Sequence, residues 1–458
     1  MPQNVKFAGA KLSGYSRNRF KIMPTGSNEA AAGRNTIFNL PENCLLDTAS
    51  VRLHCQVRTT KLTGSGGVEV YGKLPADGSS LIQRLNLSIN GVSVSNQVSE
   101  YNSLCRVLKL AGGSSRDRDQ TVDRAVSHGA IDTSAAEEDV SLIISEWRGA
   151  LTESSTRFWP LNALGAVQME LTWADNSVLL PIEDDGGTVT SVTKALDTAG
   201  DLSANAKAVS PNLSYSVSNL YLTVDTIQFG DGLYDQLLRK RLADEAFVPI
   251  YYRDYFSFSH DGINTDADTV RFAVAASSVD KCIATFRNGS YRSPGVRGIQ
   301  LDNTIGDAYI SNYFRFRSYD SQTTKNGTLK MQYRVNSTPH PTYPQAVTES
   351  LADIAYTMDK VGPTSAGIVQ SSLEGFNDGQ FAHVLTLAHP SGNMVGQLGL
   401  DSRGITSQFE FVFTGLSAPG ASSAEVSGQQ VATASAFIVV QVTSMLMLAM
   451  GREVTVQH

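Results

Sequence analysis

Regular alternation of apolar and polar residues is the feature that most limits how this chain can fold. In the segment VRLHCQV, residues 51–57, Leu53, Cys55 and Val57 fall on one side, whereas His54 falls on the other and is expected to point away from the core. Successive side chains of a strand point to opposite faces, so this pattern predicts a strand with one buried face. The same alternation recurs at residues 167–173, 270–274, 331–335 and 409–413. The chain is therefore predicted to be mainly β in both halves.

The stretch LIQRLNLSINGVSVSNQVSEYNSL, residues 81–104, joins two such strands to a helix. Asn90 and Gly91 separate the strands, and this dipeptide favours a type I′ turn because both positions require positive φ. Three stripes of apolar residues with helical spacing predict three helices, the third beginning near Pro344 and ending near Gly362. The stripes are Val98, Tyr101, Leu104, Cys105 and Leu108; Tyr234, Leu237, Leu238 and Leu242; and Val347, Leu351, Ile354, Ala355 and Met358.

Length and composition indicate two domains rather than one. A chain of 458 residues is long for a single core. A boundary is predicted at residues 229–233, where a strand pattern gives way to a helix and the chain divides into nearly equal halves. A net charge of -7 argues against a protein whose whole surface binds nucleic acid. Four polar stretches are expected to be projecting loops: residues 112–141, 183–210, 287–303 and 362–379.

The cysteines and the most apolar run predict buried structure. The four cysteines form no CxxC pair, and the N-terminus lacks the apolar segment of a secretory signal, so we expect a reduced intracellular compartment. Cys55 and Cys105 lie on apolar stripes and are predicted to be small buried residues. The run at residues 437–450 is shorter than the roughly 20 apolar residues of a membrane-spanning helix, and it predicts a buried strand.

Motifs for catalysis, cofactors and metals are absent from the sequence. The glycines at residues 64–67 lack the Lys-Ser/Thr pair that a phosphate-binding loop needs. His383 and His389 would face one side of a strand, but no third zinc ligand lies near them. The sequence therefore predicts a protein that is not an enzyme and that carries no cofactor and no metal.

The order of five segments resembles that of a known family, the major capsid proteins of polinton-like viruses and virophages, in the adenovirus-like lineage of double-stranded DNA viruses. The segments are FNLPENCLLDTASVRLHCQV, IQRLNLSINGVSVSNQVSEYNSL, RFWPLNALGAVQMELTWADN, YSVSNLYLTVDTIQF and FIVVQVTSMLMLAMGREVTV. The family's hairpin and helix match residues 89–92 and 100–104, a later strand matches residues 160–173, and its closing motif matches residues 451–456. Many relatives carry Lys or Arg in the penultimate strand, where this chain has SMLMLAM.

The resemblance implies an all-β fold in which two antiparallel eight-stranded jelly-roll β-sandwiches stand side by side, with a few short helices and long surface loops. Residues 1–30 would form a basic N-terminal arm, residues 31–230 the first jelly roll and residues 231–458 the second. The implied function is that of a structural major capsid protein, which trimerises into pseudo-hexameric capsomers that tile an icosahedral shell around a double-stranded DNA genome. The implied partners are neighbouring capsomers and minor capsid and penton proteins, in a virion capsid assembled inside the host cell.

The N-terminal segment is basic within an acidic chain, with no acidic residue before Glu29. Its cations are Lys6, Lys11, Arg17, Arg19 and Lys21. One interpretation is a solvated, partly disordered terminus. The other is an inward-facing arm that contacts genome DNA, an internal membrane or a neighbouring capsomer. The resemblance favours the second, because termini in this family commonly lie at the inner face of the shell.

Two alternative functions remain open. A β-rich adhesin or carbohydrate-binding surface protein would use exposed Tyr251, Tyr252 and Tyr255 as a sugar platform, although the segment YYRDYF also fits a strand with one buried face. A β-sandwich hydrolase would use Asp184 and Asp185, but neighbouring residues of a strand point to opposite faces.

Overall fold

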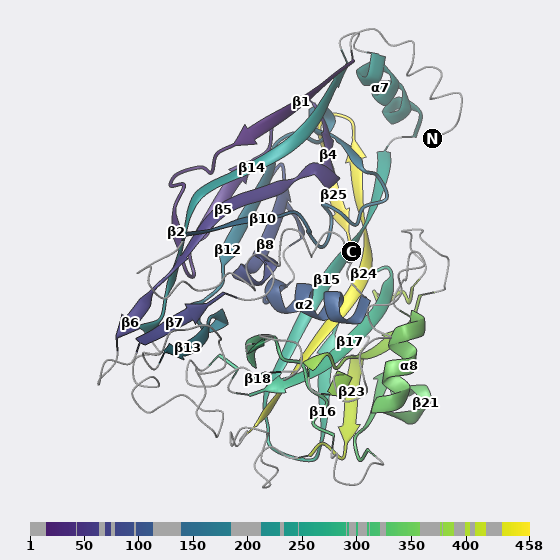
Figure 1. The fold of residues 1–458 in the computed structure, drawn as a ribbon. Coiled ribbons are helices and arrows are strands. Elements are labelled where there is room, and N and C mark those ends of the chain that lie inside the picture. The colour runs from purple at the N-terminus through teal and green to yellow at the C-terminus, as the bar shows by residue number, and fades with distance from the viewer. Residues whose placement is uncertain are drawn as a thin grey trace.

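The chain folds into two antiparallel β-sandwiches that stand side by side, one from each half of the sequence (Figure 1). The structure is a computed structural model. It describes residues 15–42, 44–63, 69–74, 78–95, 98–112, 139–184, 212–229, 233–245, 247–289, 291–292, 299–300, 309–310, 312–320, 327–357, 376–377, 379–388, 399–403, 408–417 and 433–458.

The first sandwich pairs two sheets of four main strands. One sheet has the order β1 (Tyr15–Ile22), β14 (Tyr215–Phe229), β5 (Arg52–Thr59), β10 (Asp139–Ile144). The other has the order β3 (Asn35–Asn39), β12 (Val167–Trp173), β8 (Ile82–Ile89), β9 (Val92–Ser95). Shorter strands extend the first sheet, namely β2 (Ala30–Ala31), β4 (Leu45–Asp47) and β11 (Phe158–Pro160), while β6 (Lys61–Thr63), β7 (Glu69–Lys73) and β13 (Leu180–Asp184) form a third sheet.

The second sandwich repeats this arrangement. One sheet has the order β15 (Phe247–Ile263), β24 (Ala434–Ala449), β17 (Val279–Asn288), β22 (His383–Thr386), with β25 (Val454–Gln457) beside β24. The other has the order β16 (Ala267–Ala273), β23 (Gln408–Thr414), β20 (Lys330–Val335), β21 (Thr338–Ala346). The short strands β18 (Ile299–Gln300) and β19 (Tyr309–Ile310) pair with each other.

The two halves therefore have the same topology. If the main strands of each half are counted along the chain, one sheet has the order first, eighth, third, sixth, and the other has second, seventh, fourth, fifth. This is the strand order of a jelly roll. The prediction of two eight-stranded jelly-roll sandwiches side by side is confirmed.

The helices connect or flank the sheets. They are α2 (Tyr101–Gly112), α5 (Leu161–Leu164), α7 (Leu233–Glu245) and α8 (Val347–Thr357), together with the 3-10 turns η1 (Thr48–Ser50), η3 (Gly78–Leu81), η4 (Asn176–Val178) and η7 (Asn312–Phe314). The three predicted helices are present. The predicted start of α8 was wrong, because Pro344 belongs to β21; Gly362 lies outside the described residues. The stripe on α7 was wrong at Leu237, whose exposed fraction is 59%.

The alternating positions named from the sequence form the two cores. Leu53, Cys55 and Val57 of β5 are buried, and Phe409, Phe411 and Phe413 of β23 are fully buried. The run predicted as a buried strand is β24, which lies between β15 and β17 and is buried from Ala434 to Ser444. All four cysteines are free and buried, and burial raises the pKa of the Cys55 and Cys105 thiols to about 12. The predicted burial of Cys55 and Cys105 is confirmed.

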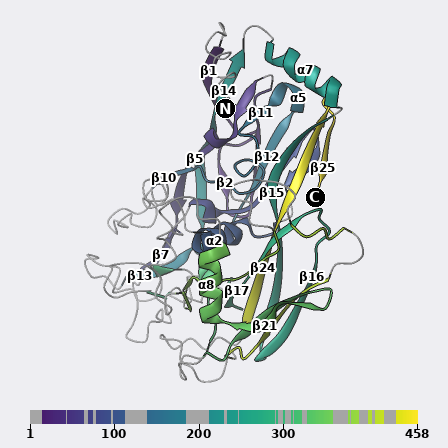
Figure 2. The same ribbon diagram turned by 90° about the vertical axis from the view of Figure 1, so that its right-hand side faces the viewer.

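A short segment of the first half pairs with the outer edge of the second. The Ser155 N–H donates to the carbonyl of Tyr251 (2.6 Å), and the Arg253 N–H donates to the carbonyl of Glu153 (3.1 Å), so residues 153–155 run along β15. In Figure 2, α7 lies at the end of the molecule where β14 finishes and β15 begins. Strand pairing in the named sheets stays within residues 15–229 or within residues 247–457. We propose a domain boundary near residue 230 on this basis.

The Asn90-Gly91 turn has the conformation predicted from the sequence. The φ angles are 49° at Asn90 and 80° at Gly91, as a type I′ turn requires. The Asn90 side chain also holds the two halves together: its Nδ2 donates to the carbonyls of Leu164 (2.7 Å) and Arg452 (2.9 Å), and its Oδ1 accepts from the Ala166 N–H (3.0 Å).

Replacing Gly91 by Val should lower the free energy of unfolding by about 1–2 kcal/mol, because a β-branched residue is strained at positive φ. A Cβ at this position meets no atom within 4 Å, so the loss reports backbone strain rather than a clash. Thermal melts would measure it, with Ser93→Val at an exposed position of β9 as the control. Equal melting temperatures for Gly91→Val and the unmodified protein would contradict the prediction.

Candidate contact surface on strand β1

The described part of the basic N-terminal segment is a strand of the first sheet. Residues 15–22 form β1, which is antiparallel to β14 from the Tyr15–Phe229 pair to the Ile22–Leu222 pair. Residues 15–22 are therefore not a loose terminus, and we propose that the first jelly roll begins with β1. Lys6 and Lys11 lie outside the described residues.

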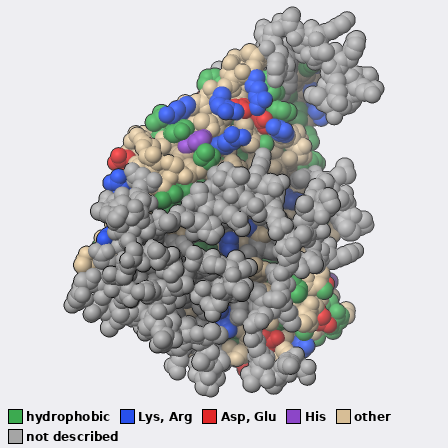
Figure 3. Space-filling view, viewed as in Figure 1, with side chains coloured by type: hydrophobic (Ala, Val, Ile, Leu, Met, Phe, Trp, Pro, Cys, Tyr) green, Lys and Arg blue, Asp and Glu red, His purple; other side chains and the backbone are tan. Residues whose placement is uncertain are grey.

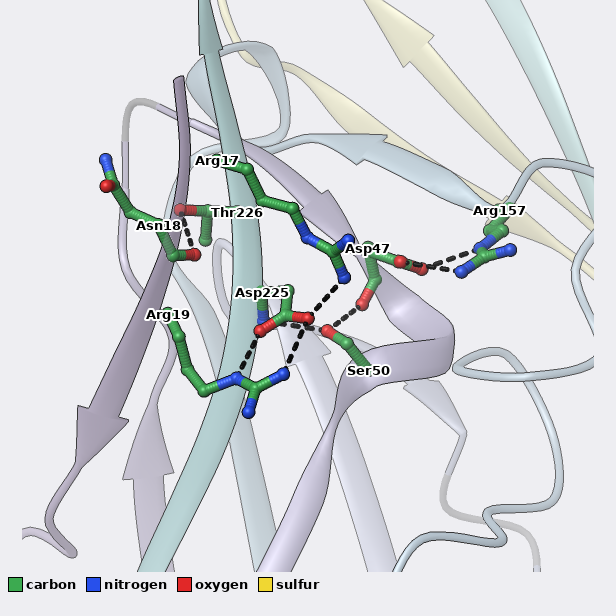
Figure 4. A network of polar contacts seen from close by, with 8 residues as sticks. All are labelled: Arg17, Asn18, Arg19, Asp47, Ser50, Arg157, Asp225 and Thr226. Atoms are coloured by element: carbon green, nitrogen blue, oxygen red, sulfur yellow. Dashed lines mark hydrogen bonds and ion pairs between the residues drawn. The ribbon is translucent and has the colours of Figure 1, made fainter.

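Arg17, Arg19 and Lys21 alternate along β1 and so share one face of the sheet. Two of them bind one carboxylate (Figure 4). Arg17 Nη2 lies 2.6 Å from Asp225 Oδ2, and Arg19 Nε lies 2.6 Å from Asp225 Oδ1. The side chains of Arg17 and Arg19 are 57% and 62% exposed, whereas that of Asp225 is 7% exposed. The hydrogen bond from Arg19 is the largest of the effects that lower the pKa of Asp225 to about 2.

The network continues into the loop before β5. The Asp225 N–H donates to Ser50 Oγ (2.8 Å), and the Ser50 hydroxyl donates to the carbonyl of Asp47 (2.6 Å). The Asp47 carboxylate accepts two hydrogen bonds from Arg157, each of 2.8 Å (Figure 4). The two buried carboxylates are thus bound by arginines that stay largely exposed, Asp225 by Arg17 and Arg19 and Asp47 by Arg157.

Lys21 and His54 lie on either side of one tyrosine. Lys21 Nζ is 4.0 Å from the centre of the Tyr221 ring, and the His54 ring stacks on Tyr221 at 4.6 Å. His54 Nε2 is 2.9 Å from Thr223 Oγ1. Partial burial lowers the pKa of His54, and the charges of Arg52, Lys21 and Arg19 lower it further. The local potential is therefore positive. The prediction that His54 points away from the core is confirmed.

These residues lie on the outer side of the first sheet, which we call the β1 cationic surface. Its cations are Arg17, Arg19, Lys21, Arg52, Arg58 and Arg157. Arg52 and Arg58 alternate with the buried positions of β5 and are exposed. Figure 3 shows Lys and Arg side chains gathered over the region of β1, β14 and β5, with smaller patches of acidic atoms among them. An anionic partner fits such a face.

Sequence reasoning missed the residues that complete this surface. Asp225 was not singled out, although Tyr221, Thr223 and Asp225 alternate with the buried Leu222 and Val224 in the segment YLTVD. That alternation is the signal that would have placed Asp225 on an outer face. Its pairing with β1 joins residues more than 200 positions apart, so no local pattern indicates it.

The structure also places the residues of the alternative hypotheses. Tyr252 and Tyr255 are 1% and 3% exposed, so they do not form a sugar platform. His383 is fully buried and stacks on Tyr333 at 5.3 Å, while His389 and Asp185 lie outside the described residues. In the part of the chain that the structure describes, no three His, Cys, Asp or Glu side chains gather as a metal site would require.

None of the helices in the described ranges has the length and apolar character needed to cross a membrane.

Solved structures that match this fold include viral capsid proteins. The chain matches the PBCV-1 virus capsid with a TM-score of 0.57 and 14% identity, covering 98% of each chain. It matches the Faustovirus major capsid protein with a TM-score of 0.55 and 9% identity, covering 96% of this chain and 91% of that one. It matches the Sputnik virophage structure with a TM-score of 0.53 and 11% identity, covering 97% and 89%.

No family model matches the sequence, and no curated protein does. The likeness lies in the fold and runs over nearly the whole of each chain. Both jelly rolls, and not only one of them, therefore have counterparts in these structures. The chain has the double jelly-roll fold of viral major capsid proteins.

Proposed function

We propose that this chain is a structural, non-enzymatic major capsid protein located in the virion capsid and assembled inside the host cell. The observation that carries the proposal is the repeated strand order of the two halves, in a fold shared over nearly full length with viral capsid structures. Neighbouring capsomers and minor capsid and penton proteins would complete the shell. Two of the three tyrosines on which a carbohydrate-binding function depended, Tyr252 and Tyr255, are buried.

Three copies should form a capsomer with pseudo-hexameric outline, because each copy supplies two jelly rolls of one topology. These capsomers would tile an icosahedral shell around a double-stranded DNA genome. The expected interfaces bury more than about 2,000 Å² each, which is the range of obligate assemblies. Light scattering should return the mass of a trimer, and negative-stain microscopy should show three-fold particles. A stable monomer at micromolar concentration would contradict the proposal.

The β1 cationic surface is the part of the subunit that we propose to face the inside of the shell. Its exposed guanidinium and ammonium groups suit the phosphates of genome DNA or the headgroups of an internal membrane. Lys6 and Lys11, which precede β1 in the sequence, would add to the same charge.

Replacing Lys21 and Arg52 together by Gln should weaken binding of duplex DNA and make it less dependent on salt. Each lost phosphate contact reduces the magnitude of the slope of log affinity against log salt by about 0.9. The slope of the double variant should therefore be smaller in magnitude by up to about 1.8. Fluorescence anisotropy with a labelled duplex at several salt concentrations measures the slope. Vesicles of anionic lipid, tested in the same way, separate headgroup binding from DNA binding.

The matched control is Lys330→Gln, which removes an exposed cation from β20 in the second half. It should leave the slope unchanged. Arg17 and Arg19 are kept in both variants because they neutralise the buried Asp225. If the double variant and the control bind both anionic partners equally well, the β1 cationic surface is not their binding site.

A further inference from the structure

The Asn90-Gly91 turn carries a reactive side chain that the proposed function does not use. In an Asn-Gly dipeptide the Asn amide reacts readily with the next backbone nitrogen, because the glycine has no side chain to block its approach. The sequence has three such dipeptides, which begin at Asn90, Asn288 and Asn326. Both residues of the first are exposed, and a Cβ built on Gly91 meets no atom within 4 Å. Water therefore has access to this turn.

Three hydrogen bonds hold the Asn90 amide in place. Its Nδ2 donates to the carbonyls of Leu164 (2.7 Å) and Arg452 (2.9 Å), and its Oδ1 accepts from the Ala166 N–H (3.0 Å). Gly165 leaves the space that the amide fills, since a Cβ on Gly165 would lie 2.6 Å from Asn90 Nδ2 and 2.8 Å from its Cγ. Both amide hydrogens and the amide oxygen are thus engaged.

The partners of this amide come from both halves of the chain. Leu164 ends α5 and Ala166 precedes β12, so both belong to the first jelly roll. Arg452 belongs to the turn between β24 and β25 in the second. The Asn90 amide is therefore fully held only while that turn is in contact with the first half.

We propose that Asn90 is a site of spontaneous deamidation whose rate is controlled by this contact between the two halves. In the reaction the backbone nitrogen of Gly91 bonds to Asn90 Cγ and loses its proton, while Nδ2 takes up a proton and leaves as ammonia. Water then adds to either carbonyl carbon of the resulting succinimide ring and breaks its bond to the ring nitrogen, which leaves aspartate or isoaspartate. Ring closure requires the amide to leave its three partners, so chains in which the contact is open react first.

Deamidation would weaken the contact irreversibly. A carboxylate has no hydrogen to donate, so its oxygens would face the carbonyl oxygens of Leu164 and Arg452, which are acceptors as well. Isoaspartate also adds an atom to the backbone of a two-residue turn, and this disturbs the register of the hairpin. A chain that stays open for long is thus converted into one whose halves no longer join in the same way.

Peptide mapping by mass spectrometry tests the control of the rate in the full-length protein at mildly alkaline pH. In guanidinium chloride the three Asn-Gly sites should deamidate at similar rates. In the folded protein Asn90 should react at least about tenfold more slowly than in the denaturant, because its hydrogen bonds must first break. Asn288 reports whether the protein is folded, since it is buried in β17 and the Gly289 N–H donates to the Thr433 carbonyl (2.8 Å).

Gly165→Ala displaces the amide without changing the reactive dipeptide. Asn90 should then deamidate at least about tenfold faster than in the unmodified folded protein, while Asn288 stays slow. The matched control is Gly262→Ala, because φ is 82° at Gly262 and 86° at Gly165, and a Cβ on Gly262 meets no atom within 4 Å. The control should leave the rate at Asn90 unchanged. An Asn90 that reacts as fast in the folded protein as in the denaturant, or that stays slow in folded Gly165→Ala, would overturn the proposal.

Asn90→Asp tests the weakened contact, and it decides the proposal if a fast Asn288 shows that Gly165→Ala has unfolded. Hydrogen exchange of residues 450–457 should become at least about tenfold faster than in the unmodified protein. The matched control is Asn336→Asp in the β20–β21 turn, where φ is also 49° and the Oδ1 accepts from the Gln408 N–H (3.2 Å), a role that a carboxylate keeps. Equal exchange of residues 450–457 in the two variants would show that the Asn90 amide does not hold the halves together.

Discussion

Replacing Glu100 by Ala should lower the free energy of unfolding by about 3–5 kcal/mol, because it leaves the Arg287 guanidinium buried without its counter-ion. Glu100 lies just before α2 in the first half, and Arg287 lies near the end of β17 in the second. Arg287 Nη2 is 2.8 Å from Glu100 Oε2, and their side chains are 0% and 2% exposed. Urea unfolding followed by tryptophan fluorescence would measure the loss.

The groups around Glu100 favour its charged form in the folded protein. The carboxylate accepts hydrogen bonds from the Tyr291 hydroxyl (2.8 Å) and the Ser103 hydroxyl (3.0 Å). Burial alone would raise the pKa of Glu100, but the charge of Arg287 and the hydrogen bonds from Tyr291, Arg287 and Arg292 together lower it to about 2. Because the folded pKa lies below the ordinary value of 4.5, this stabilisation is present above pH 4.5 and is lost as the pH falls toward 2.

Two controls separate charge burial from general damage. Arg292 binds the same carboxylate but is 55% exposed, so Arg292→Ala should cost about 1 kcal/mol or less. The double variant Glu100→Leu, Arg287→Met replaces both charges by apolar groups and should recover much of the stability lost in Glu100→Ala. If Glu100→Ala costs no more than Arg292→Ala, Arg287 is not held by this ion pair.

Replacing Asp254 by Asn should raise stability at pH 8 by up to about 4 kcal/mol and change it little at pH 4. Asp254 is fully buried on β15; its Oδ1 accepts a hydrogen bond from Ser95 (3.1 Å), whereas its Oδ2 has no hydrogen-bond partner among the described residues. Burial raises the pKa of this carboxyl from 3.8 to about 7. The imidazole of His458 lies 3.5 Å from Oδ2, and burial lowers the pKa of His458 as well.

The direction of this pH dependence follows from the raised pKa of Asp254. The protonated Asp254 carboxyl fits the folded state, so its contribution is fully present below pH 3.8, is lost as the pH rises to about 7, and stays lost above that. Asn cannot ionise and therefore avoids the loss. Thermal melts between pH 4 and 8 would test this, with Asp244→Asn on the exposed face of α7 as the control. A stability difference that does not change with pH would refute the assignment of the shift to Asp254.

The sequence predicted those strands that have one apolar face. In β5, β12 and β23 the alternating residues pack into a core, and the burial of each face follows from the residues themselves. Strand β1 could not be found in this way, because YSRNRFKI is polar on one side and mixed on the other. Residues 15–22 form a strand because they pair with β14, some 200 residues later, whose Asp225 binds Arg17 and Arg19.

Local sequence patterns did not predict the buried charges either. Arg287 begins a stretch that the sequence marks as a polar loop, yet it is the end of a buried strand. Its partner Glu100 lies 187 positions earlier, beside a helix that was predicted for its apolar stripe alone. Leu237 shows the opposite error, since its helical spacing matched a buried stripe and its side chain is exposed. The ion pair between Glu100 and Arg287 joins the two halves of the chain, so the sequence of neither segment alone predicts it.

The strand order has a consequence for synthesis on the ribosome. In each half the last main strand lies between the first and the third: β14 separates β1 from β5, and β24 separates β15 from β17. Neither sheet can form completely until the last strand of its half has left the ribosome. In a chain that ends before β24, the edges of β15 and β17 that pair with β24 have no partner. Such edges favour aggregation over docking. Only a chain that has been translated through its final strand can therefore complete both of these sheets.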